Sequence, residues 1–199
     1  MIMRSAIIPL LRYEEDPDIQ PGMIMEPLAE YLQVVYVVLR ADGWEPLWQR
    51  DMEEHDLWME ELLPLAKDNL ERLYAGKYTT RSLNFSRELP GTLPFFRADV
   101  LPAFCTPSLM LLDSMWAAVR EATGATLVAV NLPAKDLLFY ADAAREKSFQ
   151  ALCQVGARCY YSAAAEEKAL SSETYVYVGG KWERFLDEED QWYEWIEKL

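Results

Sequence analysis

Residues 106–141 constrain the fold more than any other stretch, because they carry successive signals for the start, end and pairing of structural elements. Thr106 is a favourable helix cap, and Pro107 suits the first helical position because it has no amide hydrogen to leave unpaired. Gly124 is typical of the position that follows a helix. Between them, apolar residues recur at helical spacing and predict one buried face: Leu109, Leu112, Met115, Trp116 and Val119.

The same stretch then changes to a sheet-forming pattern. Residues 126–132 are apolar and rich in β-formers, residues 133–136 contain turn-forming proline and aspartate, and residues 137–140 are again apolar. We therefore expect a helix that leads into a buried strand, a turn and a second strand. The centre of the protein is predicted to be a helix packed on a sheet.

A hairpin is predicted before this centre. Residues 32–40, LQVVYVVLR, are almost continuously apolar, which is typical of a central strand covered on both faces. Asp42 and Gly43 form a strong hairpin turn, which predicts a return strand at residues 44–49. Pro46 restricts this return strand to a sheet edge, because proline cannot donate a backbone hydrogen bond.

A second hairpin is predicted near the end of the chain. Residues 174–178 and 181–186 alternate in a strand-like pattern on either side of Gly179 and Gly180. Paired glycines supply the backbone conformation that tight hairpin turns require.

Two long helices are expected as well. From Asp56, which is a candidate cap, apolar residues recur at helical spacing as far as Tyr74. Pro64 within this pattern predicts a kink or a start delayed to about Leu62. Residues 143–170 predict the second helix, in which Gly156 indicates a close packing contact or a bend.

The remaining segments complete an α+β prediction. Residues 5–11 and 94–98 are expected to be short strands, residues 77–92 a loop or weak strand, and residues 187–199 a short amphipathic helix. The sequence thus predicts a single α+β domain over residues 1–199. Its sheet is expected to be mixed or mostly antiparallel with hairpins, packed by three to four helices.

The charge balance limits the classes of partner. The 199 residues include 19 Lys and Arg against 33 Asp and Glu, for a formal net charge of -14. Such a surface repels phosphate backbones and anionic membranes, so neither nucleic acid nor membrane is an expected partner. It attracts basic proteins, although high acidity also serves solubility alone.

The cysteines and hydropathy indicate a soluble cytoplasmic protein. Cys105, Cys153 and Cys159 are odd in number and lack CxxC spacing, which argues against a disulfide framework or a zinc knuckle. Reduced, buried thiols are the expected state. No stretch approaches the roughly 18 uninterrupted apolar residues of a membrane span.

In the order of its segments, the chain resembles the YtpQ-like family of uncharacterised bacterial proteins, a family of unknown function. The matching segments are residues 32–39, LAKDNLERL at 65–73, LMLLDSMW at 109–116, VAVNLPAKDLLFYAD at 128–142 and ETYVYVGGKWERF at 173–185. The resemblance covers residues 26–186 and leaves residues 187–199 as an acidic aromatic extension. It implies an α+β fold and carries no catalytic assignment.

Catalytic equipment is sparse. His55 is the only histidine, which excludes a two-histidine metal site, although a nucleophilic pair with Cys105, Cys153 or Cys159 stays open. Phosphate-binding glycine loops are absent, so no nucleotide cofactor is expected, and no metal is expected either.

Asp113 stands beside the apolar stripe of the central stretch, and a buried carboxylate must be paired or protonated. One interpretation makes it a structural acid, paired with Arg97, Arg120 or Lys135. The other makes Asp113 and Asp136 a functional carboxylate pair near the end of the central strand.

Aromatic and acidic residues gather in two places. One set surrounds the first hairpin: Trp44, Trp48, Asp51, Glu53, Glu54 and Trp58. The other forms the tail: Asp187, Glu188, Glu189, Asp190, Trp192, Tyr193 and Trp195. Either the tryptophans fold inward and the acids are solvated, or the sets anchor a protein interface.

Two hypotheses follow. The first is a non-enzymatic protein that binds a basic protein partner, most concretely an immunity protein that neutralises a toxin domain encoded beside it. The second is an enzyme of unknown reaction that uses Asp113, Asp136 or a cysteine. The identity of the partner and the oligomeric state stay open.

Overall fold

The structure is a computed structural model, and it describes residues 2–88, 91 and 93–186. Within these residues the α+β class is confirmed, with hairpins and antiparallel pairing throughout. The described α-helices are α1 (Gln49–Glu54), α2 (Met59–Tyr74), α3 (Asp113–Thr123) and α4 (Glu146–Ala164). The described residues also form the short 3-10 helices η1 (Arg4–Ala6), η2 (Ala103–Cys105) and η3 (Pro107–Leu111).

The strands divide into two sheets, which the sequence patterns did not separate. The smaller sheet contains β1 (Ile7–Tyr13), β2 (Met25–Ala29), β3 (Leu32–Arg40) and β4 (Gly43–Pro46). As predicted, β3 is central: β1 pairs along one side, while β2 and β4 pair with successive halves of the other side. Pro46 ends β4, and among the described strands β4 pairs only with β3.

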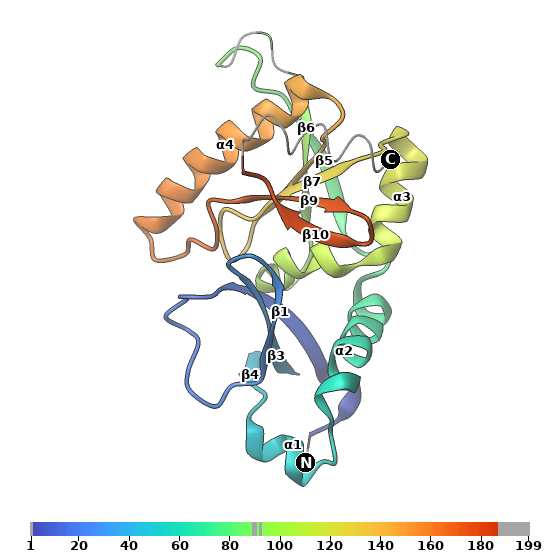
Figure 1. The fold of residues 1–199 in the computed structure, drawn as a ribbon, viewed down its shortest axis with the longest axis vertical. Coiled ribbons are helices and arrows are strands. Elements are labelled where there is room, and N and C mark those ends of the chain that lie inside the picture. The colour runs from blue at the N-terminus through green and yellow to red at the C-terminus, as the bar shows by residue number, and fades with distance from the viewer. Residues whose placement is uncertain (1, 89–90, 92, 187–199) are drawn as a thin grey trace.

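The larger sheet has the order β10-β9-β7-β8-β6-β5. Its strands are β5 (Thr79–Leu83), β6 (Phe95–Asp99), β7 (Val128–Asn131), β8 (Leu138–Asp142), β9 (Thr174–Val178) and β10 (Lys181–Arg184). The two predicted pairs β7–β8 and β9–β10 are confirmed, and Gly179 and Gly180 both have positive φ in the latter turn. In Figure 1 this sheet fills the upper half, with the small sheet and α2 below it.

One hydrophobic cluster runs through both halves of the molecule. It includes Ile8 of β1, Leu70 of α2, Trp116 of α3 and Tyr175 of β9. A second cluster lies under α4, on the opposite face of the large sheet. Because the first cluster is continuous, the two sheets form one domain rather than two.

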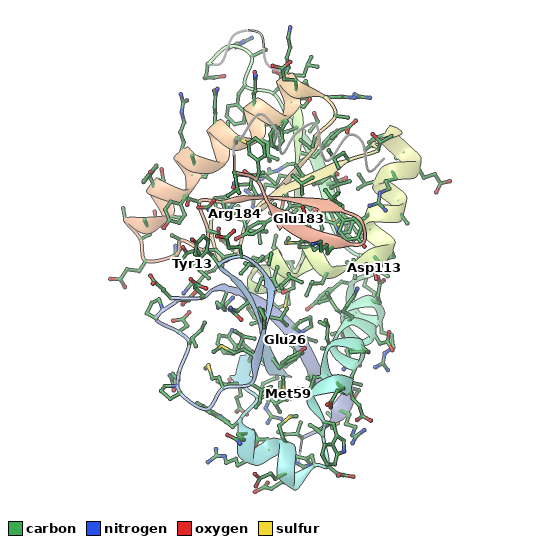
Figure 2. The ribbon with its side chains drawn as sticks, viewed as in Figure 1. Tyr13, Glu26, Met59, Asp113, Glu183 and Arg184 are labelled. Carbon is green, nitrogen blue, oxygen red and sulfur yellow. The ribbon has the colours of Figure 1, made fainter. Side chains whose placement is uncertain are left out.

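Ionic contacts also join the two sheets. Arg184 of β10 donates two hydrogen bonds to the Glu30 carboxylate, at 2.8 and 3.0 Å, and its guanidinium lies 4.8 Å from the Tyr31 ring centroid. Tyr31 in turn stacks on Tyr13, with ring centroids 5.9 Å apart, and Figure 2 labels Tyr13 and Arg184 in the region where the halves meet. A separate ion pair joins Lys135, between β7 and β8, to Asp16, between β1 and β2, with Nζ 2.9 Å from Oδ1.

The predicted central helix is interrupted, which corrects the expectation of a continuous helix from Pro107. Residues 107–111 form η3, Leu112 is extended, and α3 begins at Asp113. The Thr106 side chain caps nothing and instead contacts Val100, with its hydroxyl 3.3 Å from the Val100 amide nitrogen. The reason is burial on several sides: η3 contacts both β1 and β8, and every residue from 107 to 112 is buried. Gly124 ends α3 as predicted, with φ of 67°.

The start of α2 differs from its prediction. Trp58 is the N-cap, so neither a cap at Asp56 nor a start delayed to Leu62 is correct. Pro64 lies in the second helical turn and is exposed, where it costs one hydrogen bond. The predicted apolar face is buried, including Leu62, Ala66, Leu70 and Tyr74.

The close contact expected at Gly156 of α4 is confirmed. A methyl group built on Gly156 would lie under 3.0 Å from three side-chain atoms of Asn131 in β7. The absence of a side chain at Gly156 therefore lets α4 approach the large sheet.

Candidate functional site

The structure separates the tryptophans of the first aromatic-acidic set. Trp44 and Trp48 are partly buried against the core, and the Arg12 guanidinium lies 5.5 Å from the Trp44 ring centroid. The Asp51 carboxylate accepts a hydrogen bond from the Trp48 backbone amide at 2.9 Å, and its side chain is 16% exposed. Trp44, Trp48 and Asp51 are thus engaged within the fold.

Trp58 is different, because its side chain faces solvent. It is 61% exposed, and the next residue, Met59, is 40% exposed. Both lie at the N-terminal end of α2, and Figure 2 labels Met59 in the lower half of the molecule. Packing of the hydrophobic core does not explain why two adjacent large apolar side chains are exposed at the start of this helix.

Acidic residues flank this pair on both sides in the chain. We use the name junction surface for the exposed residues at the α1–α2 connection: Glu53, Glu54, Asp56, Trp58, Met59, Glu60 and Glu61. Glu60 and Glu61 occupy the first turn of α2, where negative charge stabilises a helix. Glu53 and Glu54 occupy the last turn of α1, where the helix dipole disfavours negative charge and no basic residue compensates. Helix stability therefore accounts for only half of these glutamates.

The N-terminal segment holds the junction in place. Arg4 donates a 2.7 Å hydrogen bond to the carbonyl oxygen of Asp56, which has φ of 50°. The Ile2 amide lies 3.3 Å from Nε2 of His55, and His55 closes the C-terminal end of α1. Leu57 is buried beneath the connection. The exposed side chains of the junction surface are therefore presented on a fixed backbone.

The cysteine-histidine pair has no geometric support in the described part of the chain. The hydroxyl of Tyr74 donates to Sγ of Cys105 at 3.3 Å, and burial raises the pKa of the Cys105 thiol to about 11. Burial also raises the pKa of Cys159. Because the thiolate is the nucleophile, a raised pKa opposes a catalytic role for these two residues. Cys153 is half-buried, with Sγ 3.5 Å from the Thr174 hydroxyl.

Asp113 is not a buried acid, which corrects that interpretation. Its side chain is 72% exposed and lies 2.8 Å from Nζ of Lys67 on α2 (labelled in Figure 2). The interruption at Leu112 makes Asp113 the first residue of α3, where solvent and the helix dipole both favour its charge.

The three partners predicted for Asp113 are engaged elsewhere. Arg97 binds Asp99 at 2.6 Å, Arg120 lies over the Tyr177 ring, and Lys135 binds Asp16 and Asp18. Asp136 is exposed in the β7–β8 turn. Among the described residues, no hydrogen bond or ion pair joins Asp113 to Asp136. The structure therefore does not assemble the predicted carboxylate pair.

The second aromatic-acidic set, residues 187–195, lies outside the described residues. Within the described ranges, no group of three histidine, cysteine or acidic side chains could hold a metal ion. No helix in the same ranges is long and apolar enough to cross a membrane.

Comparison with known proteins adds no assignment, because no protein-family model, curated protein or solved structure matches the chain. The YtpQ-like resemblance therefore stays a prediction from the motifs.

Proposed function

We propose that the protein binds a basic protein partner through the junction surface and has no catalytic activity of its own. The observation that carries this proposal is Trp58, a tryptophan 61% exposed on a fixed backbone between acidic residues. Tryptophan is among the residues most enriched at the energetic centres of protein interfaces. The acids around it would repel acidic partners and attract basic ones.

The most concrete form of the proposal is an immunity protein in the bacterial cytoplasm that neutralises a toxin domain encoded beside it. The net charge of -14 supports long-range capture of a basic domain, since opposite charges accelerate association. Desolvation of Trp58 and Met59 in the complex would then slow dissociation. The acidic side chains would set partner selection and the tryptophan the lifetime of the complex.

The test measures binding of the full chain to the purified basic domain encoded by the adjacent gene. Trp58→Ala is expected to weaken the complex by about 2 kcal/mol, or about 30-fold in Kd, mainly through faster dissociation. Tyr161→Ala is the matched control, because Tyr161 is 72% exposed on α4, away from the junction surface.

Charge is tested separately by two variants of equal charge change. Glu53→Lys with Glu54→Lys is expected to slow association by about tenfold at low salt, whereas Glu14→Lys with Glu15→Lys, also exposed, has a smaller effect. Equal effects of the two pairs would show that only net charge matters. Absence of any binding by the adjacent domain would overturn the immunity form of the proposal.

A further inference from the structure

A pocket of about 350 Å³ lies at the far end of the large sheet, away from the junction surface. It is lined by residues of β5, β6 and β8, of the C-terminal half of α3 and of the first turn of α4. The exposed residues Ser82, Leu93 and Arg145 lie at its rim. Its volume is at the lower end of the range of about 300–1,000 Å³ that small-molecule sites occupy.

The inner surface is mainly apolar. The Phe96 and Tyr140 rings come from paired strands and are nearly parallel, with centroids 5.2 Å apart and an interplanar angle of 16°. Val119 and Ala125 contribute further apolar surface from the end of α3 and the residues after it. This arrangement suits the flat face of an aromatic or short aliphatic group, which gains free energy by leaving water.

One end of the pocket offers hydrogen-bond donors. Ser148 lines this end and is 5% exposed as a residue, and the part of the chain that the structure describes shows no side-chain hydrogen bond from it. Its hydroxyl is not one of the fully enclosed polar atoms that lack a partner, so it is accessible from the pocket and can donate to a ligand acceptor. The Arg145 side chain, 60% exposed, stands next to it at the start of α4 and contacts Asp142 at 3.4 Å with one of its nitrogens.

The charges at this end decide between acceptor types. The Asp142 carboxylate lines the same end and is occupied by Arg145 and by the Ala144 amide at 3.1 Å. A ligand with a full negative charge would meet this carboxylate, and like charges at close range repel. A neutral carbonyl oxygen can accept from Ser148 and Arg145 without that repulsion.

We propose that this pocket binds a small neutral molecule with a flat apolar body and a carbonyl acceptor at one end, of the aromatic amide class. The apolar body lies on Phe96 and Tyr140, and the carbonyl oxygen accepts from the Ser148 hydroxyl and the Arg145 guanidinium. The site is independent of the junction surface, because it shares no residue with it.

The experiment titrates the ¹⁵N-labelled full chain with phenylacetamide and with phenylacetate, which has a similar shape but carries a charge. Phenylacetamide is expected to cause saturable amide shifts centred on Ala141, Asp142 and Ser148, and to bind at least about 3-fold more tightly than phenylacetate. A ligand this small is expected to bind weakly, so the titration extends to about 10 mM phenylacetamide. If no saturable shifts are seen up to that concentration, the proposed site is wrong. Tighter binding of phenylacetate would overturn the neutral class.

Two variants with matched controls locate the binding. Ser82→Trp introduces a large side chain at the rim and is expected to abolish the shifts, whereas Ser86→Trp, exposed outside the pocket, leaves them unchanged. Ser148→Ala is expected to weaken phenylacetamide by about 3- to 10-fold, with Ser162→Ala on the same helix as the control. If Ser148→Ala binds as tightly as the unsubstituted chain, the proposed hydrogen bond is wrong, whether or not Ser82→Trp folds.

Discussion

Substitution of Gly156 by alanine tests how α4 is seated on the large sheet. The new methyl group would lie under 3.0 Å from Oδ1, Cγ and Nδ2 of Asn131, a fully buried residue. The Asn131 amide cannot turn away freely, because Nδ2 donates to the Glu173 carbonyl oxygen at 2.9 Å and lies 3.3 Å from the Thr174 hydroxyl. Alanine must therefore displace the helix or break these hydrogen bonds.

The magnitude follows from three opposing contributions. Overpacking a buried contact costs about 1–3 kcal/mol, and leaving the Asn131 amide and its partners unsatisfied costs about 1–3 kcal/mol. The higher helix propensity of alanine returns about 1 kcal/mol. We therefore expect Gly156→Ala to lower the free energy of unfolding by about 3 kcal/mol, which corresponds to a fall in Tm of about 6–12 °C for a chain of this size.

Urea unfolding of four proteins provides the assay: the unsubstituted chain, Gly156→Ala, Asn131→Ala and the double variant. Removing the Asn131 side chain clears the space for the methyl group, so the two substitutions should couple by about 2 kcal/mol. A Gly156→Ala protein more stable by about 1 kcal/mol, as propensity alone predicts, would refute the close contact. Additive effects of the two substitutions would refute it equally.

Three further predictions concern charged and titratable groups. Arg184→Ala removes the contacts with Glu30 and Tyr31 between the two sheets and should lower the free energy of unfolding by about 1–3 kcal/mol. Arg184→Lys should recover only part of this lost stability in the same urea assay. Asp113→Asn should change stability by no more than about 1 kcal/mol, because its ion pair with Lys67 is solvent-exposed; a loss above about 3 kcal/mol in urea would restore the buried-acid interpretation. The folded-state pKa of Cys105 is about 11, above its ordinary value of 9.0, so this thiol should resist iodoacetamide at pH 8. The stability that the folded chain gains from keeping this thiol protonated should be lost as the pH rises from 9 towards 11. Mass spectrometry of alkylated peptides and urea midpoints across this pH range check both statements, and rapid alkylation of Cys105 in the folded chain at pH 8 would contradict them.

Local signals predicted the elements whose conformation depends on neighbouring residues. The bounds of β3 match residues 32–40, and Gly124, Gly179 and Gly180 have the positive φ expected of helix ends and hairpin turns. These features follow from burial pattern and steric freedom within a few residues. They could therefore be predicted without knowledge of the tertiary structure.

Tertiary packing decided what the patterns missed. The helical spacing of Leu109 and Leu112 predicted one buried face, yet η3 lies between two sheets and all of its residues are buried, so the chain breaks the helix at Leu112. That interruption also moved Asp113 to the surface. The spacing of apolar residues in the sequence reflects one buried face, whereas the burial of η3 on its other side depends on a second sheet that is distant in the sequence.

The candidate site was predicted in part. Glu53 and Glu54 are exposed, as the sequence predicted. Trp44, Trp48 and Trp58 have similar acidic surroundings in the sequence, yet their side chains differ in burial. Trp44 belongs to β4, and both Trp44 and Trp48 pack against the core cluster, whereas Trp58 is the N-cap of α2. The pocket could not be predicted, because Ser82, Thr123 and Ser148 are ordinary surface-type residues that only the tertiary fold brings together.

Hydrogen exchange of the full chain, alone and in complex with the basic domain encoded by the adjacent gene, tests the proposed binding surface most directly. The proposal predicts slower amide exchange on binding for residues 50–62, which carry the junction surface, and little change across the exposed face of α4. Protection confined to α4 or to the large sheet, with residues 50–62 unchanged in a saturated complex, would contradict it.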